Sequence, residues 1–332
     1  MQTRRLGRIG PEASAVGLGC MGMSGMYGHA DRAESIATIR AALDAGINVL
    51  DTGDFYGMGH NELLIAEALR GVPREEYLLS VKFGALRAPE GSWLGVDARP
   101  AAVKNSLAHS LTRLGVDHVD IYRPARVDPN VPIEETVGAI GEMVDAGYVR
   151  YVGLSEVGAD TIRRATLAHP ICDLQIEYSL ISRGIEDAIL PTCRELGIAI
   201  TAYGVLSRGL ISGHFSADRQ LEPGDFRAHA PRFSEENRKR NLELVEELRA
   251  IANGIGASVA QVAIAWVLAR GEDIVPLIGA RTRERLAEAL GALDVTLGDD
   301  DRAALEQAVP LEDVAGDRYP ETQMAMLDSE RT

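Results

Sequence analysis

Residues 48–57 read NVLDTGDFYG, and this stretch decides the class of fold. It begins as an apolar, β-branched run typical of a buried strand, and the run ends at Asp51, followed by a short loop that holds Tyr56. A strand that is apolar on both faces belongs to a parallel sheet covered by helices. In such a sheet the polar residues that follow the strand lie at its carboxyl end, where sites are built.

Seven further runs of the same kind occur along the chain. The eight predicted strands are residues 15–19, 48–52, 77–82, 119–123, 150–155, 172–178, 199–204 and 274–279. Segments with helical spacing separate most of them, at residues 32–45, 62–69, 101–114, 133–146, 160–167, 185–196, 237–251 and 259–269. Alternation of strand and helix requires right-handed crossovers in a parallel sheet, and eight units close into a barrel. We therefore expect an α/β fold, a (β/α)8 TIM barrel, with an open doubly wound sheet as the alternative.

The length of 332 residues exceeds the roughly 250 that such a barrel needs. We expect one domain over residues 1–332, with long βα loops at the C-terminal face of the barrel. Residues 85–97 and 214–234 are the candidate pocket loops, and the acidic, weakly patterned residues 311–332 are expected to form a C-terminal extension.

Charge and composition exclude several classes of partner. The formal net charge is -15, without a clustered basic stripe, which disfavours nucleic acid and anionic membrane surfaces. The three cysteines form no metal-type pair, and the start of the chain has no apolar signal core, so a cytoplasmic location is expected. The seven histidines are scattered outside the predicted strand ends, so no metal is expected.

Three polar residues form a candidate proton-transfer group. Lys82 ends an otherwise apolar strand, where an ammonium must be paired or functional, whereas a surface lysine is the plainer interpretation. Asp51 and Tyr56 follow the preceding strand and emerge on the same face. The phenol of Tyr56 is a poor acid until a nearby cation lowers its pKa, and Asp51 can keep Lys82 charged. Carbonyl reduction needs such an acid, because hydride delivery leaves an alkoxide to be protonated.

Residues 17–22 read GLGCMG, a formal G-x-G-x-x-G after a strand. A dinucleotide fingerprint opens directly into a helix, but here the next helix begins only near residue 31. The motif is therefore interpreted as a glycine-rich βα loop that lets a ligand approach the backbone.

With these features in place, the sequence resembles the aldo-keto reductase superfamily, most closely its bacterial branch similar to potassium-channel β-subunits. The resemblance covers nearly the whole chain, and the matching blocks are residues 16–23, 51–53, 56–57, 81–84, 127–136, 152–156, 175–179 and 278–282.

The resemblance implies roles for individual residues. Asp51, Tyr56 and Lys82 fall on the family's catalytic residues. The positions that fall on its cofactor site are Met21 and Gly22 beside the ribose and nicotinamide, Ser155 and Gln175 at the carboxamide, Tyr203 on the ring, Leu206, Arg208 and Gly209 over the pyrophosphate, Gly279, Arg281 and Arg285 at the adenosine, and Glu288 near the adenine. Two arginines at the adenosine suit a 2′-phosphate, so NADPH is expected in preference to NADH.

The fourth strand departs from the family's pattern. The family usually has a histidine before Arg-Val-Asp, where this chain has Ala125 before Arg126. Loss of the imidazole removes a hydrogen-bond donor and leaves room in the substrate pocket, for which Trp93 of the 85–97 loop is a further candidate.

Two functions are compatible with the sequence. The first is NADPH-dependent reduction of a bulky or cyclic ketone to a secondary alcohol, and the second is an NADPH-binding regulatory module with little turnover. The complete Asp51, Tyr56 and Lys82 group favours the enzyme. A short-chain dehydrogenase is excluded, because no tyrosine is followed four residues later by lysine.

Overall fold

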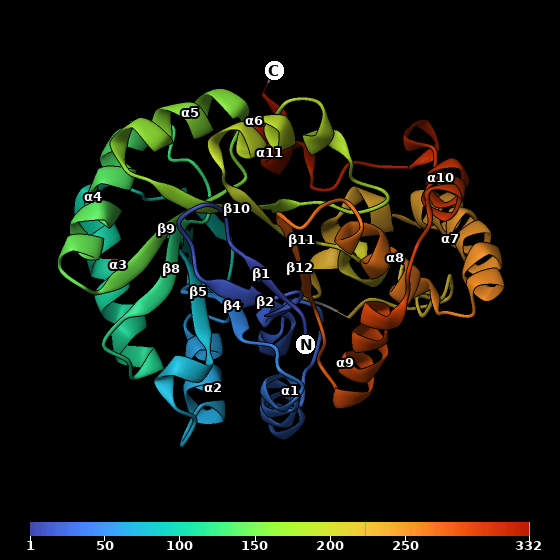
Figure 1. The fold of residues 1–332 in the computed structure, drawn as a ribbon, viewed down its shortest axis with the longest axis horizontal. Coiled ribbons are helices and arrows are strands. Elements are labelled where there is room, and N and C mark those ends of the chain that lie inside the picture. Colours follow the sequence, from blue (N-terminus) through green and yellow to red (C-terminus); the bar gives the residue numbers. More distant parts are fainter. Residues whose placement is uncertain (223, 332) are drawn as a thin grey trace.

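The computed structural model describes residues 1–222 and 224–331, so position 223 of the 214–234 loop and position 332 of the extension lie outside the described residues. Eight parallel strands form a closed barrel at the centre (Figure 1). In order around the barrel they are β3 (Gly17–Gly19), β4 (Val49–Gly53), β5 (Leu78–Phe83), β8 (Val119–Pro124), β9 (Val149–Ser155), β10 (Ile171–Glu177), β11 (Ala199–Tyr203) and β12 (Ile274–Ile278). All eight predicted strands are confirmed.

The barrel closes where β12 pairs with β3, with Leu277 opposite Gly17 and Ile278 opposite Leu18. A Cβ atom on Gly17 would lie 2.7 Å from Cδ2 of Leu277 and 3.2 Å from Cβ of Val49. Glycine is therefore required for the close approach of strands at this seam. Because the first and last strands pair, the open sheet is excluded.

Helices surround the barrel and bury their apolar sides against it (Figure 1). They are α1 (Arg32–Asp44), α2 (His60–Ala68), α3 (Pro100–Leu114), α4 (Ile133–Asp145), α5 (Ala159–Ala168), α6 (Ile189–Leu196), α7 (Glu235–Ile255), α8 (Val259–Leu268), α9 (Arg283–Leu290) and α10 (Asp299–Ala308). The eight predicted helical segments are present. The sequence did not predict α9 and α10, which bury only two residues and one residue respectively and so carry little periodic signal.

Within the described chain no single helix is long and apolar enough to cross a membrane, and only the sharply bent pair α7 and α8 meets the criterion by combined length and composition. Eight of the ten residues of α8 are buried in the protein.

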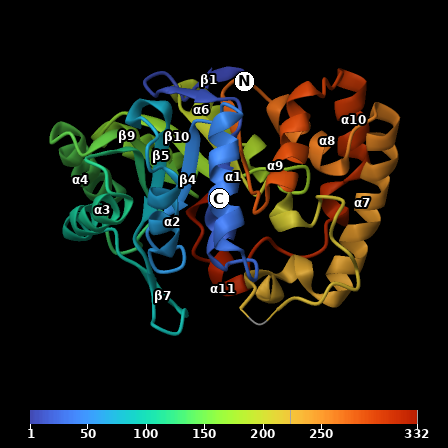
Figure 2. The same cartoon turned by 90° about the horizontal axis from the view of Figure 1, so that it is seen from below.

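The two ends of the barrel are closed differently. At one end an unpredicted hairpin of β1 (Thr3–Arg5) and β2 (Glu12–Ser14) carries Leu6 and Ala13 into a small core with residues of five barrel strands. At the other end lie the hairpin of β6 (Ala85–Arg87) and β7 (Trp93–Val96), the 214–234 loop and the short α11 (Glu321–Met324) (Figure 2). Both predicted pocket loops therefore lie at the carboxyl end of the barrel.

Candidate active site

A cavity of about 630 Å³ opens at the carboxyl ends of the barrel strands. Every residue that the sequence analysis selected lines it: Met21, Gly22, Asp51, Tyr56, Lys82, Trp93, Ala125, Arg126, Ser155, Gln175, Tyr203, Leu206, Arg208, Gly209, Gly279, Arg281, Arg285 and Glu288. The barrel thus brings together residues that are up to 267 positions apart in the chain, between Met21 and Glu288.

Lys82 lies in a closed hydrogen-bonded triangle on the cavity floor. Its Nζ donates to Oδ1 of Asp51 at 2.5 Å and to Oε1 of Gln175 at 2.9 Å, while Nε2 of Gln175 donates to Oδ2 of Asp51 at 2.6 Å. All three side chains are buried. Burial lowers the pKa of Lys82 and Asp51 opposes this, so the ion pair is what keeps the ammonium charged. Gln175 is expected at the nicotinamide. In this structure its side-chain amide accepts a hydrogen bond from Lys82 and donates one to Asp51.

Tyr56 lies beside this triangle, with its ring centroid 5.2 Å from Nζ of Lys82. Burial, together with the negative charge of Asp51, raises the pKa of Tyr56 well above its usual value, whereas Arg126 lowers it. The expectation of a phenol with a lowered pKa is therefore not met, because loss of solvent and the charge of Asp51 outweigh the charge of Arg126. The phenol consequently stays protonated at neutral pH, the form that can give a proton.

A second polar layer supports the triangle from below. Arg123 and Asp173 form a fully buried ion pair, with Nη2 and Oδ2 2.9 Å apart. Nη2 of Arg123 also donates to Oγ of Ser80, and this hydroxyl donates to Oδ2 of Asp51 at 2.9 Å. Sequence reasoning missed Arg123 and Asp173. The sequence does contain a signal for them, because each is a charged residue inside an apolar strand. The same argument selected Lys82.

Two buried groups in the cavity fit the expected cofactor. Oγ of Ser155 and Nη1 of Arg208 have no hydrogen-bond partner among the described residues. Buried polar atoms nearly always have a partner, so both are suited to a ligand. A hydroxyl at the end of β9 can bind a carboxamide and a guanidinium can bind a phosphate, which are the roles the resemblance implies for these two residues.

The predicted adenosine end carries two arginines, which differ in whether a carboxylate pairs with them. Nη1 of Arg281 donates to the backbone oxygens of Tyr27 and His29, at 3.0 and 3.1 Å. Nη1 of Arg285 lies 2.9 Å from Oε2 of Glu288. Within the described residues, Arg281 has no carboxylate partner, whereas the charge of Arg285 is balanced. Arg281 is thus the stronger candidate for an additional phosphate.

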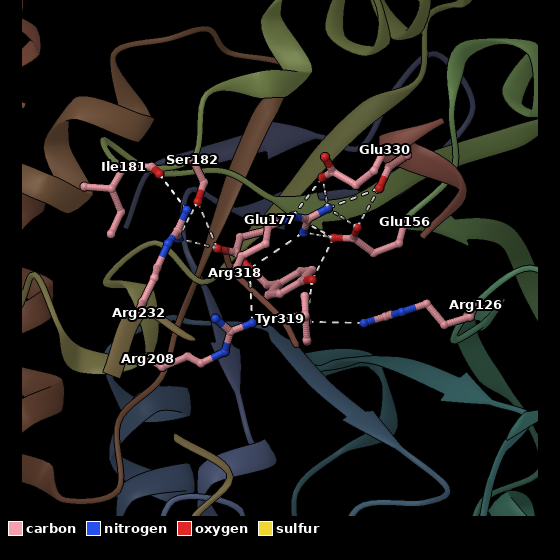
Figure 3. Close-up of polar contacts among 12 residues, drawn as sticks. Arg126, Glu156, Glu177, Ile181, Ser182, Arg208, Arg232, Arg318, Tyr319 and Glu330 are labelled. Carbon is pink, nitrogen blue, oxygen red and sulfur yellow. Dashed lines mark hydrogen bonds and ion pairs between the residues drawn. The ribbon is translucent and has the colours of Figure 1, made fainter. Parts of the chain in front are cut away.

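The C-terminal segment reaches the predicted substrate end, which the sequence did not indicate. Nη2 of Arg126 donates to the hydroxyl of Tyr319 at 3.2 Å, and that hydroxyl lies 2.9 Å from the hydroxyl of Tyr203. Arg318 anchors this segment through two hydrogen bonds to the carboxylate of Glu156, at 2.9 and 2.6 Å (Figure 3). Residues 311–331 are therefore a structural part of the site rather than an appended tail.

Glu156 is fully buried and adopts a φ of +54°, which is rare for a residue other than glycine. Burial raises its pKa, but Arg318 outweighs this and holds the pKa of Glu156 well below its ordinary range. Tyr203 and Ser329 donate further hydrogen bonds to the carboxylate, at 2.6 and 2.8 Å. The strained carboxylate is thus held by several contacts at once, which is how such backbone strain persists.

Comparisons with known proteins agree with this architecture. The model of the aldo/keto reductase family matches residues 15–310. A probable aldo-keto reductase from Glycine max is 42% identical over 322 residues, covering 96% of this chain and 92% of the relative. The solved glycerol dehydrogenase from Gluconobacter oxydans superposes with a TM-score of 0.83 at 29% identity, covering 92% of this chain and 94% of its own. A thermostable aldo-keto reductase solved with the inhibitor epalrestat gives 0.74 at 27% identity, covering 93% and 100%.

The fold and these matches define an NAD(P)H-dependent oxidoreductase that acts on carbonyl compounds. The chain belongs to the aldo/keto reductase family.

Proposed function

We propose that this enzyme uses NADPH to reduce a bulky or cyclic ketone to a secondary alcohol, with Tyr56 as the proton donor. The observation that carries the proposal is the buried phenol of Tyr56 beside the Lys82 and Asp51 ion pair, in the same cavity as the Ser155 hydroxyl, which has no partner among the described residues. The nicotinamide, when bound, supplies the hydride. Ser155 and Gln175 would hold its carboxamide, and Tyr203, Met21 and Gly22 would flank the ring and ribose.

Tyr56 is suited to protonate an alkoxide because its neutral form predominates at physiological pH. As the proton leaves, negative charge develops on the phenol oxygen, and the ammonium of Lys82 stabilises that charge. Asp51 and Gln175 keep this ammonium in place through one hydrogen bond each, and a third hydrogen bond joins them to one another. The triangle therefore acts on the proton transfer and not on substrate binding.

Ala125 supports the choice of a large ketone. It lines the cavity at the end of β8, and its backbone N–H donates to the oxygen of Phe83 at 2.8 Å, which holds the strand end in place. An alanine here leaves the space that an imidazole would occupy, at the cost of one donor to the carbonyl oxygen. A large ketone can offset this loss with binding energy from its remote parts, whereas a small aldehyde cannot.

We expect the enzyme to reduce cyclic ketones with a higher kcat/KM than small aldehydes, measured by NADPH absorbance. Ala125→His should shift this ratio at least about tenfold toward the aldehydes, because it fills the pocket and restores a donor. An unchanged ratio would refute the role of Ala125. If no carbonyl compound in the panel were reduced while NADPH still bound, the protein would be the regulatory module instead.

We also propose NADPH as the preferred cofactor, through Arg281. Arg281→Ala should weaken NADPH binding about 10- to 100-fold, which corresponds to one lost charge-assisted contact, and should affect NADH much less. Arg285→Ala should have a smaller effect, because Glu288 already balances Arg285. Fluorescence titration with each cofactor measures this.

Arg283→Ala is the matched control, since Arg283 lies between the two on the chain but pairs with Glu34 and does not line the cavity. Equal affinity of the wild-type protein for both cofactors would contradict the proposal.

A cytoplasmic location is proposed with this function. It is supported by the free and buried thiols of Cys20, Cys172 and Cys193, which suit a reducing compartment. The net charge of -15 favours a small-molecule partner over nucleic acid or a membrane surface.

A further inference from the structure

The cavity has the opposite charge to the protein as a whole. Within the part of the chain that the structure describes, one lysine and seven arginines line it against three carboxylates, although the chain carries a net charge of -15. Cofactor phosphates can neutralise the arginines near Arg281, where Arg219 and Arg227 also lie. They do not explain Arg87, whose guanidinium lies 5.7 Å from the ring centroid of Trp93, or Arg126, whose guanidinium lies 5.6 Å from that of Tyr319.

Of the arginines labelled in Figure 3, which are Arg126, Arg208, Arg232 and Arg318, Arg126 is the one whose guanidinium has no carboxylate partner among the described residues. Arg208 and Arg232 each pair with Glu177, and Arg318 pairs with Glu156 (Figure 3). Arg126 donates only to neutral oxygens, the backbone carbonyl of Ala125 at 2.6 Å and the hydroxyl of Tyr319 at 3.2 Å. The charge of Glu156 acts on Arg126, but Glu156 lies beyond ion-pair distance of it and is already paired with Arg318. A guanidinium does not lose its proton, so a partly buried one without an ion-pair partner favours an anionic ligand.

A chain of hydrogen bonds holds Arg126 toward the cavity. The hydroxyl of Tyr203 donates its single proton to Glu156 at 2.6 Å, so the hydroxyl of Tyr319 donates to Tyr203 and presents its lone pairs to Arg126. Glu156 is in turn held by Arg318. Arg126 is thus positioned by an ordered series of groups that ends at a buried ion pair.

Another residue that lines the cavity has a donor without an acceptor. Nε1 of Trp93 is buried and has no hydrogen-bond partner among the described residues. Indole N–H is a donor only, so this group is suited to an acceptor oxygen of a ligand. The carbonyl oxygen of a neutral ketone accepts from Tyr56 and has one lone pair left, whereas a carboxylate adds two further acceptor oxygens and a negative charge.

We propose that the ketone substrate carries a carboxylate, that is, an oxo acid, and that Arg126 binds this carboxylate while Tyr319 positions the guanidinium. The proposal rests on the proposed ketone reduction, and it specifies the chemical class of substrate that reaction takes. Arg126 directly follows Ala125 at the end of the strand. The carboxylate that it binds would therefore lie next to the space that Ala125 leaves.

The test compares phenyl-substituted oxo acids, with zero to two carbons between the carbonyl and the carboxylate, with their methyl esters. For at least one acid, the wild-type enzyme should show a kcat/KM about 10- to 100-fold above that of its ester. Arg126→Met should abolish this preference, and the exposed control Arg163→Met should retain it. Tyr319→Phe should reduce the preference partly, through the KM for the acid and not through kcat.

The proposal is overturned if every ester is reduced as well as its acid, or if the preference survives in Arg126→Met. Reduction of neutral ketones without any preference for acids would refute the oxo acid while leaving the ketone reduction intact. If no compound is reduced, the proposed function is wrong, and the role of Arg126 is then tested by measuring ligand binding. Calorimetric titration with phenylacetate and phenylacetamide should show tighter binding of the anion to the wild-type protein than to Arg126→Met, and equal binding of the anion to both proteins overturns the inference.

Discussion

Tyr56→Phe is expected to lower kcat about 10²- to 10⁴-fold on any good substrate while leaving NADPH affinity nearly unchanged. The substitution removes the one phenol that lies beside the Lys82 and Asp51 ion pair, and general acid catalysis commonly contributes a factor of this size. It retains the aromatic ring, which packs edge-on against Phe55 with centroids 4.7 Å apart. No described residue forms a hydrogen bond with the lost hydroxyl, so folding should be preserved.

Steady-state kinetics at saturating NADPH, together with a cofactor titration, measure the two effects separately. Tyr148→Phe serves as the matched control, because Tyr148 is 49% exposed and does not line the cavity. A variant at position 56 with near wild-type kcat would show that another group donates the proton. Lys82→Met is a less clean test, since it leaves the buried carboxylate of Asp51 without its cation.

Arg318→Leu is expected to destabilise the protein by about 3–5 kcal/mol, because it removes the ion-pair partner of the buried Glu156. Arg318 also lies 3.7 Å from Glu177 and 2.6 Å from Glu330, so its loss releases the segment that presents Tyr319. Urea denaturation followed by circular dichroism gives the free energy of unfolding. The activity of the folded variant should also fall, since Tyr319 no longer positions Arg126.

Arg163→Leu is the control for this prediction, because it removes an arginine from the exposed ion pair with Glu195 and should change stability far less. The effect should also depend on pH. The folded state holds the pKa of Glu156 below its ordinary value of 4.5, so the stabilisation is present above that pH and is lost as the pH falls. The difference in the free energy of unfolding between the wild-type protein and Arg318→Leu should therefore become smaller in acid. If Arg318→Leu and Arg163→Leu destabilised the protein equally at neutral pH, the prediction would be contradicted.

The local sequence determined the barrel and most of its site. Apolar runs such as residues 48–52 identify strands because a strand buried on both faces can hardly contain anything else. The alternation with helices then sets the topology, and a lysine at the end of an apolar strand indicates a site because an unpaired buried charge is costly. These arguments use only neighbours along the chain, and they selected Asp51, Tyr56 and Lys82, which line one cavity in the structure.

Other features depended on contacts between distant segments, and only the tertiary structure decided them. The extension has no periodicity of its own, yet Arg318 is 162 positions from Glu156 and pairs with it in the core. The pKa of Tyr56 rises instead of falling because burial, which no local pattern reports, acts together with the charge of Asp51 and outweighs the charge of Arg126. The excess of positive charge in the cavity is likewise invisible in a chain with a net charge of -15. Strand and helix patterns depend on residues that are neighbours along the chain. The burial of a charged side chain, and the residue that pairs with it, depend on segments that only the folded chain brings together.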